Sequence, residues 1–84
     1  MEYEIDREII SMIASMTGFE PDEVTPEMSI VKDLGADSLK IIEIASAFNK
    51  KYKVVVEENQ LTQMRTVGQS IALVKELLGK KQNS

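Results

Sequence analysis

Three segments of this sequence repeat apolar residues at steps of three and four, the period at which an α-helix buries one face. They cover residues 3–16, 37–52 and 66–78. Residues 54–56 form a run of three valines, but the sequence holds no second run to pair with it, and a lone strand is not stable. We therefore expect an extended connector there and an all-α fold.

Polar residues and glycines mark the ends of these helices. Gly18 suits the left-handed conformation that follows a helix, and Gly79 is expected to end the last one. Asp37 is a good N-cap for the second helix. Thr66 and Gln69 fit a capping box at the start of the last helix.

Between the first two helices, residues 19–36 contain both prolines and show no apolar period, so we expect a long loop that packs across the bundle. Residues 25–28 can form one helical turn there, with Pro26 at its first position. A short third helix is expected within residues 57–64. The prediction is a small irregular four-helix bundle, with three longer helices and one short one. It forms a single domain over residues 1–79, followed by a polar tail at 80–84.

Composition narrows the classes of function. The chain has 84 residues with no Cys and no His, so it lacks the usual zinc ligands and the commonest activated side chains of enzymes. We expect neither a metal site nor a stand-alone enzyme. The pI of about 4.8 and the absence of an Arg-rich patch argue against nucleic-acid binding. Without a signal peptide or a spanning apolar run, a cytoplasmic monomer that does not enter a membrane is expected.

The run Asp-Leu-Gly-Ala-Asp-Ser-Leu at residues 33–39 is the most informative stretch. A loop containing Gly35 delivers Ser38 to the first turn of a helix that Asp37 caps. Backbone N–H groups are unpaired there and the helix dipole is positive, so a phosphate on the Ser38 hydroxyl is electrostatically favoured. By itself, the same stretch is also an ordinary junction between a loop and a helix.

Over residues 3–78 the chain resembles the acyl carrier protein family. The seven residues 33–39 look like that family's modification motif, and they stand between an amphipathic helix with its long loop and a second helix. Tyr-Lys-Val-Val-Val at 52–56 is similar to the segment after that helix, and Met-Arg-Thr-Val-Gly at 64–68 to the start of the last helix.

The resemblance implies that a phosphopantetheinyl transferase attaches phosphopantetheine, taken from coenzyme A, to Ser38, beside Asp37 and Leu39. Acyl groups are then carried as thioesters and presented to fatty-acid, lipid or polyketide enzymes of ketosynthase, acyltransferase or acyl-ligase type. Five side chains are expected to face these partners: Leu39, Lys40, Ile42, Glu43 and Ser46. Seven are expected to shelter the acyl chain or to form plain core: Ile9, Ile13, Ile44, Phe48, Val67, Ile71 and Val74.

The second helix departs from the family pattern. Fatty-acid carriers usually have a strongly acidic second helix, whereas Lys40, Lys50 and Lys51 give residues 37–52 a net charge of +1. Because like charges suppress wrong pairings, a specialised carrier is expected instead of the housekeeping one for fatty acid synthesis. Two alternatives stay open: an aminoacyl or peptidyl carrier, and an unmodified helical interaction module.

Overall fold

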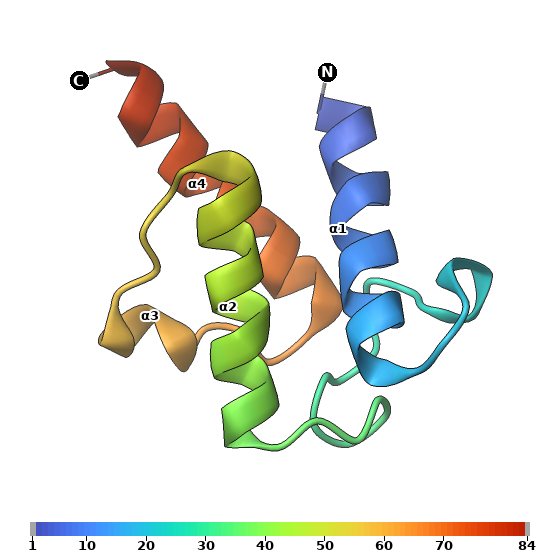
Figure 1. Ribbon diagram of the computed structural model, residues 1–84. Helices are drawn as coiled ribbons and strands as arrows, with labels where there is room; N and C mark the ends of the chain where they lie inside the picture. Colours follow the sequence, from blue (N-terminus) through green and yellow to red (C-terminus); the bar gives the residue numbers. More distant parts are fainter. Residues whose placement is uncertain (1, 84) are drawn as a thin grey trace.

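A computed structural model describes residues 2–83, and the side chains of residues 4–80. Four α-helices follow one another: α1 (Glu2–Thr17), α2 (Ser38–Tyr52), α3 (Glu58–Leu61) and α4 (Val67–Asn83). A single 3-10 turn, η1 (Pro21–Glu23), interrupts the long loop. α1 packs against both α2 and α4, and the short α3 lies beside α2 (Figure 1). Residues 2–83 contain no strand, which confirms the predicted all-α bundle.

The core lies between the three longer helices, as their apolar periods predicted. Ile9 and Ile13 of α1 and Ile44 and Phe48 of α2 are each 0 % exposed. α4 and the segment before it contribute Met64, Val67, Leu73 and Val74, all at 2 % or less. No helix in the described part of the chain combines the length and the apolar content needed to cross a membrane.

The predicted end of α1 and the predicted start of α4 are both present. Gly18 has a positive φ of 84°, as expected after α1. At the start of α4, the Thr66 N–H donates to Gln69 Oε1 (3.1 Å) and the Gln69 N–H donates to Thr66 Oγ1 (3.0 Å). This reciprocal pair is the capping box that the sequence predicted.

Two predicted details were wrong. α4 does not end at Gly79 but continues to Asn83, because a glycine costs a helix only about 1 kcal/mol and Gly79 does not take the left-handed conformation that ends one. The helical turn lies at Pro21 and not at residues 25–28, which form one hydrogen-bonded turn. Glu20 and Glu23 cap η1 reciprocally, with the Glu20 N–H 2.8 Å from Glu23 Oε1.

The long loop is fastened to the connection between α3 and α4. The Ile30 N–H donates to the Arg65 carbonyl (2.9 Å), and the Gly68 N–H donates to the Pro26 carbonyl (2.9 Å). A Cβ on Gly68 would stand 3.2 Å from that carbonyl oxygen, so the close approach favours glycine. As predicted, apolar loop residues pack across the bundle, and Ile30 is fully buried. The loop is therefore held in place by backbone hydrogen bonds before it leads into α2.

Candidate functional site

The turn before α2 turns Ser38 outward. Leu34 and Ala36 are each 5 % exposed and anchor the turn in the core. Between them Gly35 has a φ of +74°, a conformation that residues with a side chain rarely adopt. The Asp33 carboxylate closes the turn by accepting the Ser29 N–H at 2.7 Å. The chain thus alternates between buried and exposed residues until it delivers Ser38 to the surface.

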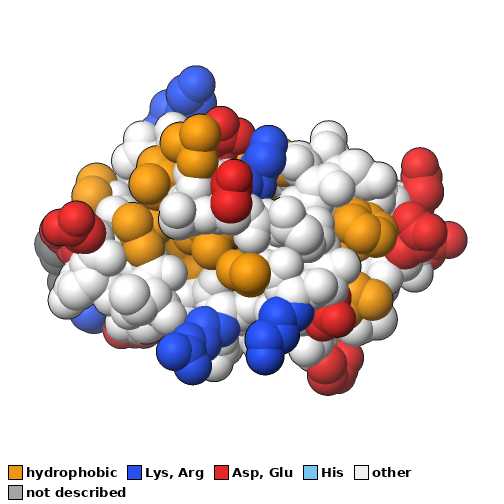
Figure 2. Space-filling view, turned by 90° about the horizontal axis from the view of Figure 1, so that it is seen from below, with side chains coloured by type: hydrophobic (Ala, Val, Ile, Leu, Met, Phe, Trp, Pro, Cys, Tyr) orange, Lys and Arg blue, Asp and Glu red, His pale blue; other side chains and the backbone are white. Residues whose placement is uncertain are grey.

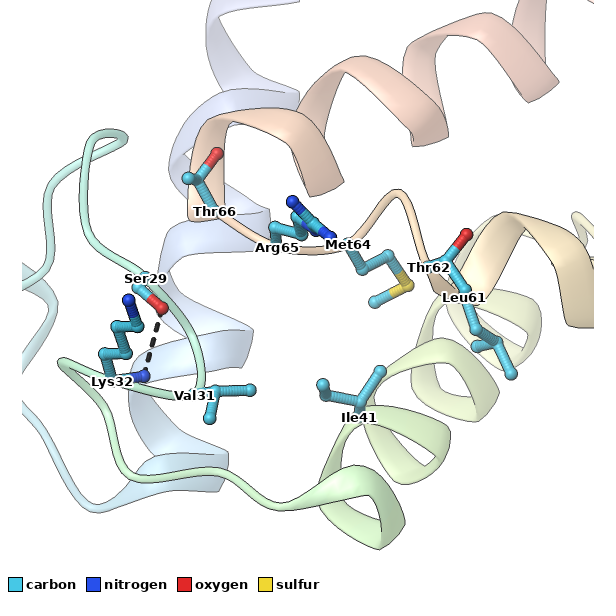
Figure 3. Close-up of a pocket in the computed structure, with 9 residues that line it drawn as sticks. All are labelled: Ser29, Val31, Lys32, Ile41, Leu61, Thr62, Met64, Arg65 and Thr66. Atoms are coloured by element: carbon cyan, nitrogen blue, oxygen red, sulfur yellow. Dashed lines mark hydrogen bonds between the residues drawn. The ribbon is translucent and has the colours of Figure 1, made fainter.

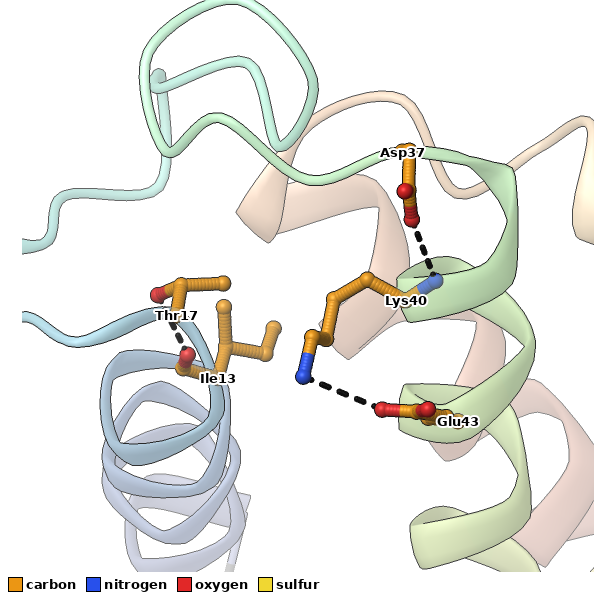
Figure 4. A network of polar contacts seen from close by, with 5 residues as sticks. All are labelled: Ile13, Thr17, Asp37, Lys40 and Glu43. Carbon is orange, nitrogen blue, oxygen red and sulfur yellow. Dashed lines mark hydrogen bonds and ion pairs between the residues drawn. The ribbon is translucent and has the colours of Figure 1, made fainter.

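Ser38 is the first residue of α2, and it is exposed. Asp37 is the N-cap, and its Oδ1 accepts the Lys40 N–H at 2.9 Å (Figure 4). The Ser38 hydroxyl makes no hydrogen bond to any other described residue. A free, accessible hydroxyl at the positive end of a 15-residue helix fits a covalently attached phosphate ester.

The expected partner-facing residues surround Ser38 along α2. Leu39 is 63 % exposed and Ile42 is 51 % exposed, which is unusual for large apolar side chains. Glu43 and Ser46 are also exposed. Lys40 is half-buried: it points toward the end of α1 and forms an ion pair with Glu43, with Nζ 3.0 Å from Oε1 (Figure 4). The face exists as expected, and its use by partners stays a prediction.

Hydrophobic side chains also gather on the outside of the bundle. Seen from below, several hydrophobic side chains gather on the side where α2 and α3 lie, and acidic side chains project at both edges, most of them on the side of the η1 loop (Figure 2). Val31 and Val55 are also large apolar residues with high exposure, at 50 % and 63 %. Exposed apolar surface of this kind is a candidate binding face.

An open groove of about 630 Å³ lies between the long loop, α2 and the α3–α4 connection (Figure 3). Its apolar walls are formed by Val31, Ile41, Leu61 and Met64. The side chains of Val31, Ile41 and Met64 point toward one another. Ile41 is one helical turn after Ser38 on α2. The sequence analysis missed this groove, because its walls come from three separate segments. The one sequence feature that pointed to this groove was the group of apolar residues in the long loop that follow no helical or strand period.

The seven residues expected to shelter an acyl chain form the closed core. Six are 0 % exposed, Ile71 is 6 % exposed, and none of the seven lines the groove. The bundle would have to part for a chain to reach them, so this role stays a prediction. The groove offers apolar surface without such opening.

Comparison with known proteins decides the family. Residues 7–80 match the family model described as a phosphopantetheine attachment site. Over 76 residues the chain is 42 % identical to the meromycolate extension acyl carrier protein of Mycolicibacterium aurum, covering 90 % of this chain and 78 % of that protein. The chain belongs to the acyl carrier protein family.

Other relatives agree with this membership. The carrier is 43 % identical to the meromycolate extension acyl carrier protein of Mycobacterium tuberculosis over 74 residues, which are 88 % of this chain and 64 % of that protein. It thus spans just under two thirds of that relative. It is also 33 % identical to the acyl carrier protein of Amoebophilus asiaticus over 78 residues, covering 93 % of this chain and 98 % of that one.

Family membership confirms the predicted carrier role and its covalent phosphopantetheine. The bound group supplies a thiol on which acyl cargo is held as a thioester. Members interact with a phosphopantetheinyl transferase and with biosynthetic enzymes. In this chain the first turn of α2 has an exposed Ser38 hydroxyl beside the Asp37 cap.

Proposed function

We propose that Ser38 is the attachment site and that this carrier serves a specialised lipid pathway. The exposed Ser38 hydroxyl, unengaged at the first residue of α2, is the observation that carries the proposal. In the transfer, the Ser38 oxygen forms a bond to the β-phosphorus of coenzyme A. The pyrophosphate bond breaks, adenosine bisphosphate leaves, and the hydroxyl proton passes to the transferase or to water.

Asp37 and Leu39 flank the attachment point and have different roles in this proposal. Asp37 holds the first turn through its bond to the Lys40 N–H, which fixes the direction in which Ser38 points. Leu39, at 63 % exposure, offers the transferase an apolar contact next to the reacting oxygen. Neither residue takes part in bond making.

The cargo is proposed to be an acyl group of lipid biosynthesis. Support comes from the apolar groove one turn from Ser38 and from relatives whose names refer to meromycolate extension. The groove takes the cargo first. Longer chains then part the core at residues such as Ile44 and Phe48. Each methylene that leaves water contributes about 0.8 kcal/mol, which offsets that opening.

The partners are proposed to be acyl-loading and chain-elongating enzymes that read the outer face of α2. Ile42 and Leu39 supply apolar contacts, and Ser46 leaves room beside them. Glu43 is already paired with Lys40, so this face offers little free negative charge to a basic enzyme surface. The carrier itself catalyses no reaction, acts as a monomer and works in the cytoplasm. Cell fractionation and sedimentation test the last two points.

Loading with coenzyme A and a broad-specificity transferase tests the attachment site. The intact mass should rise by about 340 Da, the mass of the arm. Ser38→Ala should abolish the gain, whereas Ser11→Ala, at an exposed serine of α1, should retain it. An unchanged mass with several transferases would instead favour the interaction module. The mass of the carrier from its native host separates acyl from aminoacyl cargo.

Specialisation has its own test. The loaded carrier is offered to housekeeping ketosynthases and turnover is measured beside a housekeeping carrier. Slow turnover is expected, because α2 lacks the acidic surface that such enzymes meet. Equal turnover would refute a dedicated pathway.

A further inference from the structure

We propose that the groove beside α2 selects acyl cargo that carries a carboxylate at the end remote from the thioester. The inference rests on the proposed function, since the cargo must be tethered at Ser38. It names the class of cargo that the groove holds best, namely half-thioesters of dicarboxylic acids.

The charged side chains that line the groove are both cations. Lys32 lies on the side of the loop and Arg65 on the side of the α3–α4 connection (Figure 3). Among the described residues, no acid lines the groove. Asp33, next to Lys32 in sequence, is outside the lining and its carboxylate accepts the Ser29 N–H at 2.7 Å. A negative group inside the groove therefore meets no lining carboxylate.

The other polar side chains of the lining already make hydrogen bonds, whereas the two cations have no ion-pair partner among the described residues. The Ser29 hydroxyl accepts the Lys32 N–H (3.0 Å), and the Thr62 hydroxyl donates to the Asn59 carbonyl (2.9 Å). Thr66 caps α4 through Gln69. In contrast, neither Lys32 nor Arg65 forms an ion pair with another described residue. Their charges are free for a ligand.

The groups that line the groove match one kind of cargo. Ile41, one turn from Ser38, lies among the apolar walls, whereas Lys32 comes from the loop and Arg65 from the α3–α4 connection (Figure 3). A tethered methylene chain covers the apolar walls and brings a distal carboxylate to the cations. The guanidinium of Arg65 is suited to hold a carboxylate through two hydrogen bonds.

The test compares cargo pairs that differ only in the distal group. A transferase loads the protein with hexanoyl or adipoyl pantetheine phosphate, and with decanoyl or decanedioyl, each from its coenzyme A thioester. The arm and its phosphate are the same in both members of a pair, so they do not contribute to the difference in melting temperature between the two. We expect the dicarboxylic form to unfold roughly 2–4 °C higher in at least one pair, as one partly exposed ion pair gives in a domain of this size. High salt should reduce the difference.

The double variant Lys32→Gln/Arg65→Gln should remove the difference. Lys50→Gln is the matched control, because Lys50 is an exposed, unpaired lysine outside the groove, and it should leave the difference intact. Equal melting temperatures in both pairs would overturn the inference, as would an equal loss in the control. Failure to load any cargo would instead contradict the role of Ser38, so the two failures are distinguishable.

Discussion

Gly35 sets the direction in which the chain approaches Ser38. Its φ of +74° reverses the backbone between two buried residues, Leu34 and Ala36, and so allows the next two residues to face water. Space does not limit this position, since a Cβ would meet no atom within 4 Å. Backbone conformation alone therefore favours glycine here.

Gly35→Ala should lower the free energy of unfolding by about 1–2 kcal/mol, the cost of a left-handed residue with a side chain. Gly79→Ala is the matched control. It also has open space around its Cβ but lies in helical backbone, and it should raise stability by up to about 1 kcal/mol. Urea unfolding followed by circular dichroism measures both. Equal effects of the two substitutions would contradict the role given to φ.

The sequence predicted residues well where the cause was local. The exposed position of Ser38, the cap at Asp37 and the turn glycines follow from short-range backbone chemistry. The ion pair of Lys40 with Glu43 has i,i+3 spacing and so could be predicted from the sequence. The partial burial of Lys40 near the end of α1 could not, because it depends on how the helices pack.

At the scale of the element, α2 begins with a cap and ends with a left-handed residue. Asp37 accepts the Lys40 N–H at the start. At the end Lys53 has a φ of 58°, and the Asn49 side chain donates to the Val54 carbonyl at 2.7 Å. The Asp37 contact satisfies an N–H that the helix leaves unpaired, and the Asn49 contact pairs a carbonyl just beyond the helix end. α2 is therefore closed by polar contacts at both ends.

Asp37→Ala should destabilise the protein by about 1 kcal/mol, because it removes the acceptor of the N-cap. Asp37→Ser retains a capping oxygen and should lose only a small part of this. Thermal unfolding of the unmodified protein compares the three forms. An Ala variant as stable as the wild type would show that the cap contributes nothing.

Helix periods and caps made the elements predictable, and the two errors have physical causes. Gly79 was expected to end α4, but a glycine ends a helix only when its backbone turns left-handed, which residue type alone does not determine. Pro21 and Pro26 are equal candidates for the first position of a turn by type. At Pro21 the Glu23 carboxylate accepts the Glu20 N–H at 2.8 Å, which supports the 3-10 turn there.

At the scale of the whole molecule, polar contacts between described residues join α1 to both α2 and α4. The Tyr52 hydroxyl donates to Glu8 Oε1 at 2.8 Å, linking α2 to α1. Lys75 Nζ lies 2.7 Å from Asp6 Oδ1, linking α4 to α1. The Tyr52–Glu8 contact spans 44 residues of sequence. Like the Lys75–Asp6 ion pair and the groove walls, it arises from the packing of distant segments. For that reason none of these could be predicted from local patterns.

Stability should fall at alkaline pH through Tyr52. Burial, followed by the hydrogen bond and the charge of Glu8, raises the pKa of Tyr52 above its ordinary value of 10.0. The folded protein then keeps the phenol neutral while the unfolded chain ionises above about pH 10. The contribution of Tyr52 to the free energy of unfolding is therefore complete below about pH 10 and is lost as the pH rises above it. The stability difference between wild type and Tyr52→Phe, from urea unfolding, should shrink above pH 10.

Glu8→Gln provides the control for this prediction. It retains an acceptor for the Tyr52 hydroxyl but removes the negative charge, so its alkaline loss should be smaller than that of the wild type. A difference between wild type and Tyr52→Phe that stays constant to high pH would contradict the raised pKa.

The fastening of the long loop to the α3–α4 connection affects delivery of cargo. Two backbone hydrogen bonds, from the Ile30 N–H to the Arg65 carbonyl and from the Gly68 N–H to the Pro26 carbonyl, hold the loop before Ser38 against the bundle. Under the proposed attachment at Ser38, most of the conformational freedom lost when a thioester enters an enzyme then belongs to the flexible arm. An enzyme that binds the proposed α2 face would thereby fix the position from which that arm extends.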